Sequence, residues 1–272
     1  VQFSAYIGIG AIATIGKAQG SALIINMFFG TVVNAGLAVA NSVSSILQTF
    51  ANNAQKPISP QIVKSYAMGD TDRCTSLVCL ASKATYLSMF FVSIPFLLVP
   101  EFIFGIWLKE VPPYAVKFTY LLIVDALIFS INAGVTDFVN ATGRIRFYQI
   151  IVNSLMVSSI VVGYLVMKLG HKPAEFLFYV YIAFSFMVFL VRPFVLVHIS
   201  KFDVWRLVRD SYLPVFLITL LFCVLFFLKP VLNVVVCLVV AYIYYCMLVL
   251  FVALKPNERA WLFGVVGKRL RR

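Results

Sequence analysis

The chain has 272 residues, of which 62% are hydrophobic and only 12% are charged, and its formal net charge is +12. Soluble domains are about 45–50% apolar and about 25% charged, and even a folded globular protein needs a polar surface. The composition therefore excludes a soluble enzyme, a disordered chain and a DNA-binding domain. What remains is a membrane protein whose basic residues contact anionic lipids, with no nucleic-acid partner.

The apolar residues form runs long enough to cross a bilayer. A bilayer core of about 30 Å requires about 20 apolar residues in a helix, whereas the strands of a barrel would alternate over about 10 residues. We therefore predict an all-α polytopic membrane protein with about eight transmembrane helices. The predicted spans are 4–28, 31–54, 75–99, 115–140, 147–169, 174–198, 211–228 and 231–254.

Two polar connections carry amphipathic patterns. The first, PISPQIVKSYAMGDTDR, predicts a short helix near 60–68 that ends at Gly69 and Asp70. The second, KFDVWRLVRD at 201–210, alternates aromatic or aliphatic residues with basic ones. We predict that this linker lies along the membrane interface and that the basic tail 255–272 touches anionic lipid in the cytoplasm.

The basic residues are distributed unequally between the two sides of this topology. With the N-terminus cytoplasmic, the opposite side holds only Lys109, Lys117, Lys168, Lys172 and Lys229, and Lys17 lies within a span. The positive-inside rule therefore favours a chain with both ends in the cytoplasm. The residues assigned to cytoplasmic segments are Lys56, Lys64, Arg73, Lys83, Arg144, Arg146, Arg192, Lys201, Arg206, Arg209, Lys255, Arg259, Lys268, Arg269, Arg271 and Arg272.

The second span has a polar face along its whole length. Its spacings of 7, 4, 3, 4 and 3 residues place Asn34, Asn41, Ser45, Gln48, Asn52 and Gln55 on one side of a helix. The other side is apolar, with Val33, Leu37, Val43, Ile46, Leu47 and Phe50. A lipid-facing helix would not carry such a face, so we expect it to line a water-filled cavity. The alternative is amide hydrogen bonding between helices.

Ionisable residues inside predicted spans are the other candidates. Lys17 lies mid-span, where it is a natural counter-charge for an anionic substrate, and Asp125 is a candidate for ion coupling. The alternative for both is an internal pair with each other. Asn132 follows on the polar side of the fourth span and is assigned to the same cavity. Asp137 is expected near water at the end of that span, and Arg192 is expected to reach the lipid headgroups.

No catalytic or cofactor-binding constellation accompanies these residues. The chain has two histidines and no P-loop, and its cysteines (Cys74, Cys79, Cys223, Cys237 and Cys246) have no ligand spacing. We therefore expect free cysteines, no metal, no cofactor and no enzyme.

Residues 16–70 resemble the bacterial polysaccharide flippases, also called O-antigen or oligosaccharide flippases, of the MATE-like multidrug/oligosaccharidyl-lipid/polysaccharide exporter superfamily. The resemblance is carried by GKAQG, NMFFG, VNAG and PQIVKSYAMGD. It implies that 1–200 is the C-terminal, six-helix lobe of such an exporter, and that 201–210 links it to two additional helices in 211–254. The first lobe would then be missing, so we expect a chain cut at its N-terminus.

The resemblance further implies a function and partners. The expected activity is transport of an undecaprenyl-pyrophosphate-linked oligosaccharide across the bacterial inner membrane for surface polysaccharide or lipopolysaccharide synthesis. It would work by alternating access, usually with ion coupling, and with polysaccharide polymerase or assembly proteins as further partners. Lys17 would meet the pyrophosphate and the Asn34–Gln55 face the sugar. Two alternatives are a drug or metabolite antiporter of the same superfamily and a scaffold subunit without transport.

Overall fold

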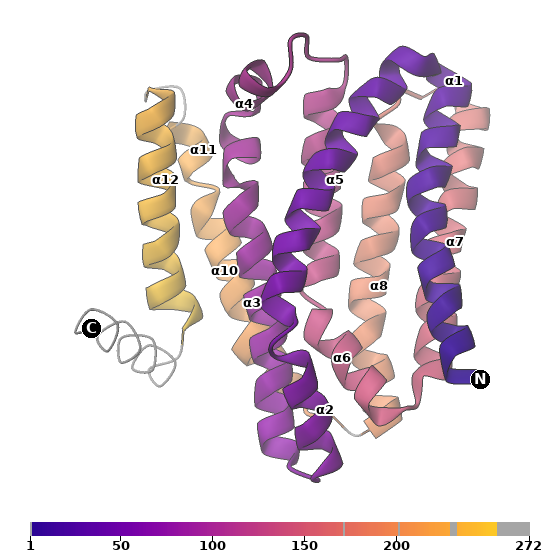
Figure 1. The fold of residues 1–272 in the computed structure, drawn as a ribbon, viewed down its shortest axis with the longest axis vertical. Helices are drawn as coiled ribbons and strands as arrows, with labels where there is room; N and C mark the ends of the chain where they lie inside the picture. Colours follow the sequence, from indigo (N-terminus) through magenta and orange to yellow (C-terminus); the bar gives the residue numbers. More distant parts are fainter. Residues whose placement is uncertain (1, 171, 201, 229–232, 255–272) are drawn as a thin grey trace.

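The computed structural model describes residues 2–170, 172–200, 202–228 and 233–254, and the predicted tail 255–272 lies outside them. The side chains of residues 2–7, 9, 11, 12, 227 and 228 are also not described. All regular secondary structure in these ranges is helical (Figure 1), which confirms the predicted all-α class. Five helices are long and apolar enough to cross a membrane, or six if the bent pair α5–α6 counts as one span.

The first helix, α1 (Gln2–Gln55), is two helices joined by a kink. Gly30 has φ 80° and ψ −178°, a backbone conformation open essentially only to glycine. The first leg rises beside α7 and the second descends across α5 toward α2 (Figure 1). The kink therefore separates the two spans that were predicted at 4–28 and 31–54.

The chain then reverses through α2 (Ser59–Ala67) into α3 (Thr71–Leu98). Gly69 adopts φ +74°, and the Asp70 side chain accepts a hydrogen bond from the Arg73 backbone N–H at 3.0 Å, which caps α3. The predicted short helix and its stop are thus confirmed. An unpredicted helix, α4 (Pro100–Trp107), follows α3, and its start carries proline at the first position and Glu101 in the first turn.

The predicted span 115–140 is broken in the structure. It consists of α5 (Ala115–Ser130) and α6 (Ala133–Thr142), which are bent by 40° at the break around Ile131 and Asn132. The next two spans are continuous, as α7 (Ile145–Gly170) and α8 (Phe176–Ser200). Gly143 has φ +70° and ends α6, so the chain can turn directly into α7.

The C-terminal part differs from the predicted division at 211. The Asp203 side chain caps α9 (Val204–Leu207), and this helix continues without a break through the π-helical turn η1 (Val208–Tyr212) into α10 (Leu213–Phe222). The linker 201–210 is therefore largely the start of that helix. Within it Phe202 and Leu207 are buried, whereas Trp205 is exposed. A turn at 223–224 separates α10 from α11 (Leu225–Leu228), and α12 (Val234–Leu248) with η3 (Val249–Ala253) completes the described chain.

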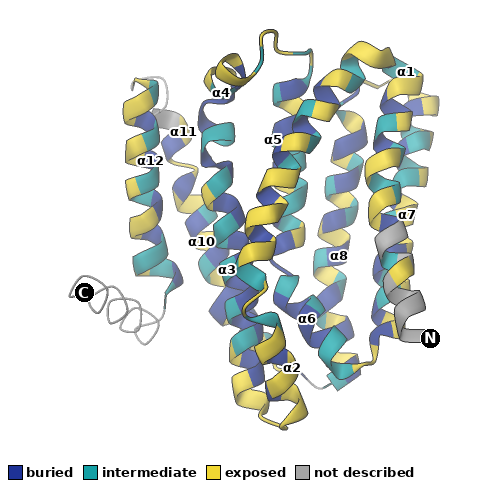
Figure 2. Ribbon diagram, viewed as in Figure 1, coloured by how far each residue is buried: buried dark blue, intermediate teal, exposed yellow. Residues whose placement is uncertain are grey.

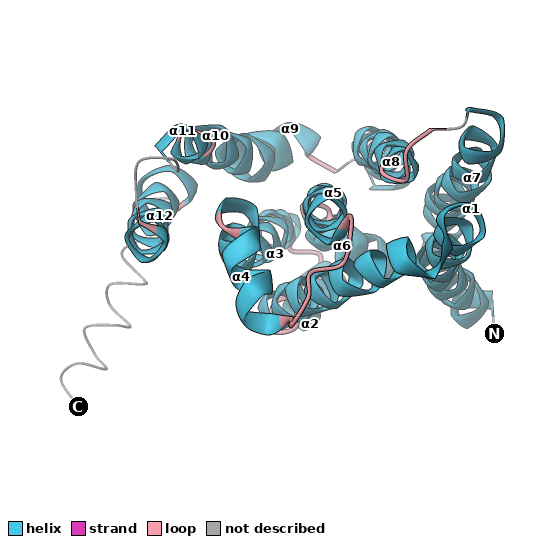
Figure 3. Ribbon diagram, turned by 90° about the horizontal axis from the view of Figure 1, so that it is seen from above, coloured by secondary structure: helices cyan, strands magenta, loops and turns pink. Residues whose placement is uncertain are grey.

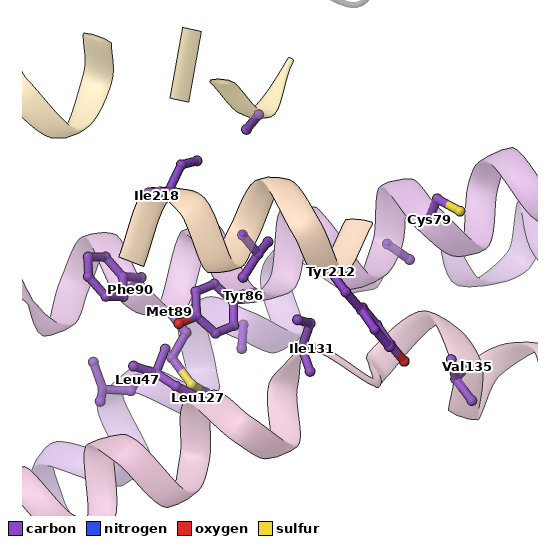
Figure 4. Packing of buried hydrophobic residues seen from close by; sticks show 14 of the residues in the cluster. Leu47, Cys79, Tyr86, Met89, Phe90, Leu127, Ile131, Val135, Tyr212 and Ile218 are labelled. Atoms are coloured by element: carbon purple, nitrogen blue, oxygen red, sulfur yellow. The ribbon is translucent and has the colours of Figure 1, made fainter. Parts of the chain in front are cut away.

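The helices pack in layers around α3 and α5. Seen from above, α9, α10 and α12 lie on one side of α3, and the second leg of α1 lies on the other (Figure 3). Figure 4 shows Tyr86 and Phe90 of α3 beside Ile218 of α10, with Leu127 of α5 and Ile131 at the break below them. Through this apolar core, α3 contacts both the broken helix α5–α6 and the C-terminal helices α9, α10 and α12.

Candidate functional site

An ion pair joins the first leg of α1 to α5 and α8. Lys17 Nζ lies 2.8 Å from Asp125 Oδ2, and the Ser185 hydroxyl donates to Asp125 Oδ1 at 2.5 Å. Lys17 Nζ also lies 3.4 Å from Ser185 Oγ and 5.0 Å from the centre of the Tyr181 ring. The two charged side chains are only 16% and 17% exposed. The sequence left two interpretations of Lys17 open, a counter-charge for a substrate and an internal pair with Asp125. The structure contains the internal pair.

A small cavity adjoins the ion pair. It has about 10 Å³ of free volume and is lined by Lys17, Phe129, Met156, Ser159, Phe184, Ser185 and Val188. That volume holds about one water molecule. Lys17 and Ser185 therefore lie beside a position that a water molecule or a small ion can occupy, but a sugar does not fit there.

The amides of the second leg of α1 lie mostly on its open side. Ser45, Gln48 and Asn52 are exposed, and Asn34 and Asn41 are partly exposed. Among the described residues, none hydrogen-bonds the side chains of Asn34, Asn41, Gln48 or Asn52. Figure 2 shows this leg exposed along its length. The polar face therefore remains available to water or to a partner.

The apolar side of the same leg is narrower than predicted. The buried residues are Leu37, Ala40, Val43, Leu47 and Ala51, which pack against the rest of the bundle. Ile46 and Phe50, predicted on this side, are instead 42% and 50% exposed. The open surface of the leg thus has an apolar part beside its amides, because the buried contact covers only one side of the helix.

Gln55 and Asp137 pair with each other at the end of this leg. The Gln55 side-chain amide donates to Asp137 Oδ2 at 2.8 Å and to the Ala133 carbonyl at 3.4 Å. Asp137 is buried, contrary to the expectation that it lies near water. Gln55 therefore ties α1 to the start of α6 and is not free to line an open cavity.

Asn132 is also occupied within the chain. It is 1% exposed, and its Oδ1 accepts a hydrogen bond from the Tyr212 hydroxyl at 2.8 Å. Tyr212 comes from η1 and points toward the break between Ile131 and Val135 (Figure 4). The structure therefore separates Asn132 from the other predicted cavity residues, since the bend at the break turns it toward the C-terminal helices.

Two cations of the predicted cytoplasmic side are buried, and for Arg192 this contradicts the expected place at the lipid headgroups. Lys83, counted among the cytoplasmic charges, is 2% exposed and donates to the Ala253 carbonyl at 2.9 Å, at the end of η3. Arg192, expected at the headgroups, is 2% exposed and lies over the rings of Phe129 and Tyr148. A period of 3.6 does place Val188 and Arg192 on one side of α8, but the sequence does not show which side is buried.

The described residues contain no group of three or more histidine, cysteine, aspartate or glutamate side chains that could hold a metal ion. All five cysteines are free.

Comparison with models of known protein families, with curated proteins and with solved structures found no match to this chain.

Proposed function

We propose that this chain is one lobe of a membrane transporter that moves an oligosaccharide carried on a polyprenyl pyrophosphate lipid. The observation that carries the proposal is the unbonded amide face of α1, with Asn41, Ser45, Gln48 and Asn52 on the open side of an otherwise apolar helix. Amides and hydroxyls in a membrane need water or polar partners, and sugar hydroxyls offer the same hydrogen bonds. The likeness of residues 16–70 to the polysaccharide flippases supports the same substrate class.

In this proposal the Lys17–Asp125 ion pair breaks when the coupling ion binds. The pairing of Lys17 with Asp125 neutralises the charge of Lys17 beside the small cavity. Protonation of Asp125 or binding of an ion would release Lys17, and the free ammonium could then attract the pyrophosphate by direct Coulomb interaction. Asp125 is the ion-coupling residue in this scheme, and Lys17 is the substrate counter-charge in only one conformation.

Cysteine accessibility tests the amide face. In the full-length protein, with Cys74, Cys79, Cys223, Cys237 and Cys246 replaced, we expect Gln48→Cys and Asn52→Cys to react with a membrane-impermeant thiol reagent. Ile46→Cys is the matched control, because Ile46 is also exposed on this leg but lies on its apolar part. Thiol reagents of this kind react only where water reaches, so lipid protects the control.

The outcomes separate the proposal from its alternatives. Reaction at Gln48→Cys and Asn52→Cys with protection of Ile46→Cys supports a water-filled cavity. Protection of all three positions would mean that the amides meet another helix bundle, which is what a scaffold subunit without transport requires.

The counter-charge role of Lys17 is tested by export itself. We expect Lys17→Ala to abolish export of surface polymer by the full-length protein and Lys17→Arg to retain part of it, since only arginine keeps the charge. Undiminished export in the alanine variant, at equal protein level in the membrane, would reject the role.

A further inference from the structure

Asp125 is the coupling residue of the proposed transport cycle, and its surroundings restrict which ion it can bind. The four helices that line the small cavity, α1, α5, α7 and α8, contain no aspartate or glutamate other than Asp125. Its Oδ2 lies 2.8 Å from Lys17 Nζ, and its Oδ1 accepts the hydrogen bond of the Ser185 hydroxyl. A cation that enters this site therefore meets a single carboxylate, which an ammonium group already neutralises.

The backbone near the pair does not supply the missing ligands. Asp125 lies inside α5, more than one turn before its end, and Lys17 and Ser185 lie inside α1 and α8. Carbonyls at such positions accept the hydrogen bonds of their own helix. At the end of α5, the Phe129 carbonyl accepts the Asn132 N–H at 3.3 Å. Metal cations need several oxygen ligands, and transporters often bind sodium with unwound carbonyls, which the described helices around the pair do not offer.

The space beside the pair also favours the smallest cation. The cavity has about 10 Å³ of free volume, which is room for about one water molecule, and Lys17 lines it. A metal ion there would lie next to an ammonium group, which repels it. A proton needs neither space nor a shell of ligands. Ser185 lines the cavity and donates to Asp125, so its hydroxyl connects the water position with the carboxylate.

We infer that the coupling ion at Asp125 is a proton and not a metal cation, and that Ser185 relays it. A hydronium ion in the cavity gives a proton to Ser185 Oγ while the Ser185 hydroxyl proton passes to Asp125 Oδ1, and a water molecule remains. The neutral carboxyl group then no longer holds Lys17. The inference rests on the proposed function, because that function makes Asp125 the coupling residue.

The other titratable groups near the pair do not replace Asp125 in this role. The Tyr181 ring on α8 has its centre 5.0 Å from Lys17 Nζ, but a phenol is neutral at neutral and acidic pH. The part of α7 that lines the cavity contributes no titratable side chain. On α3, which also packs against α5, Lys83 bonds a carbonyl at the end of η3, and Arg192 lies two helical turns beyond Ser185 on α8. Of these groups, only Asp125 changes its charge on acidification.

Infrared difference spectroscopy detects this proton directly. For the purified full-length protein in detergent, we expect acidification to produce the C=O stretch of a protonated carboxylic acid, with a component that Asp125→Asn lacks. Ser185→Ala should shift the frequency of that component, because the hydroxyl bonds Oδ1. Asp137→Asn is the matched control: Asp137 is also buried, but its partner is the Gln55 amide, so this variant should keep the Asp125 component.

Thermal unfolding of the same proteins tests sodium. A ligand that binds only the native state raises the unfolding temperature. We expect replacement of choline chloride by sodium chloride, at constant ionic strength, to change the unfolding temperatures of the wild type and of Asp125→Asn equally. A saturable sodium stabilisation that Asp125→Asn loses would overturn the inference. So would a wild-type spectrum without any acid component that depends on Asp125.

If Asp125→Asn does not fold, Ser185→Ala decides, since it keeps both charges of the pair. A shifted acid component supports the inference, and a spectrum identical to that of the wild type overturns it. Neither measurement involves transport. Sodium binding at Asp125 would therefore reject the proton and leave the transport proposal standing, whereas protection of the amide face would reject transport without changing the titration of Asp125.

Discussion

Lys17, Lys83 and Arg192 lie within the helix bundle, and each side chain is stabilised in a different way. Lys17 has a carboxylate partner in Asp125, Lys83 meets a carbonyl at the end of η3, and Arg192 lies against two rings. A cation at the C-terminal end of a helix interacts favourably with its unsatisfied carbonyls. The role of a buried cation therefore depends on the partner that it meets, and the residue type alone does not predict that partner.

The Lys17–Asp125 pair gives a prediction at this scale. Lys17→Gln and Asp125→Asn should each destabilise the protein, because each leaves a mostly buried charge without its partner. The double variant should recover part of the loss. We expect a coupling free energy of about 1–3 kcal/mol from thermal unfolding of the four proteins in detergent.

The exposed pair Lys117–Glu175 is the control for this cycle. Its nitrogen and oxygen are 3.2 Å apart, but the Lys117 side chain is 64% exposed. Pairs of this kind contribute about 0–1 kcal/mol. A coupling at Lys17–Asp125 no larger than that of the control would contradict the buried-pair argument.

At the scale of elements, the fold depends on where helices bend. The kink at Gly30 turns one long helical run into two legs, and the break at Ile131 and Asn132 bends α5 against α6. The close approach at Gly134 also belongs to this break: a Cβ there would lie 2.2 Å from the Val78 carbonyl oxygen of α3. These positions fix the course of the legs that carry the amide face and the ion pair.

Gly30→Ala tests the kink. No atom lies within 4 Å of the added Cβ, so the cost comes from the backbone alone, at φ +80°. We expect a loss of about 1–3 kcal/mol in the free energy of unfolding. Gly105→Ala in α4 is the matched control, since its Cβ also meets open space and its φ is not positive. There alanine should be neutral or stabilise by up to about 1 kcal/mol, and equal effects at both sites would contradict the argument.

At the scale of the whole molecule, the two ends of the bundle differ in their number of basic residues. The end with α2 and the start of α7 (Figure 1) carries Lys56, Lys64, Arg73, Arg144 and Arg146, and Arg206 of α9 joins it through Asp72. Arg206 contacts Asp72 and Ser76 at the start of α3, and Arg144 contacts the Ile199 carbonyl, which brings these segments together. The opposite end, with α4, carries Lys109, Lys117, Lys168 and Lys172. This asymmetry is what the positive-inside rule expects of our prediction that the α2 end faces the cytoplasm.

Labelling from outside the cell tests this orientation. In the cysteine-free protein, Met68→Cys lies at the α2 end and Val111→Cys in the loop after α4, and both native side chains are exposed. We expect an impermeant thiol reagent to label Val111→Cys in intact cells and to label Met68→Cys only after permeabilisation. The reverse pattern would show that the opposite end faces the cytoplasm.

Much of the fold follows from local properties of the sequence. Long apolar runs predict helices because a bilayer leaves backbone groups no other partner, and Gly30, Gly69 and Gly143 mark reversals that only a flexible backbone allows. The break in 115–140 and the continuous helix from Val204 to Phe222 were missed, since both depend on contacts with distant helices such as the Tyr212–Asn132 hydrogen bond.

By itself, the sequence determined that the chain is helical and apolar, where its reversals fall, and which polar side chains share the face of one helix. Only the tertiary structure decided which of those side chains form ion pairs or hydrogen bonds with other helices. It pairs Lys17 with Asp125, commits Gln55 and Asn132 to other helices, and buries Arg192 without a carboxylate. The physical reason is that helical periodicity sets the direction of a side chain on its own helix, whereas the partner it meets depends on how separate helices pack.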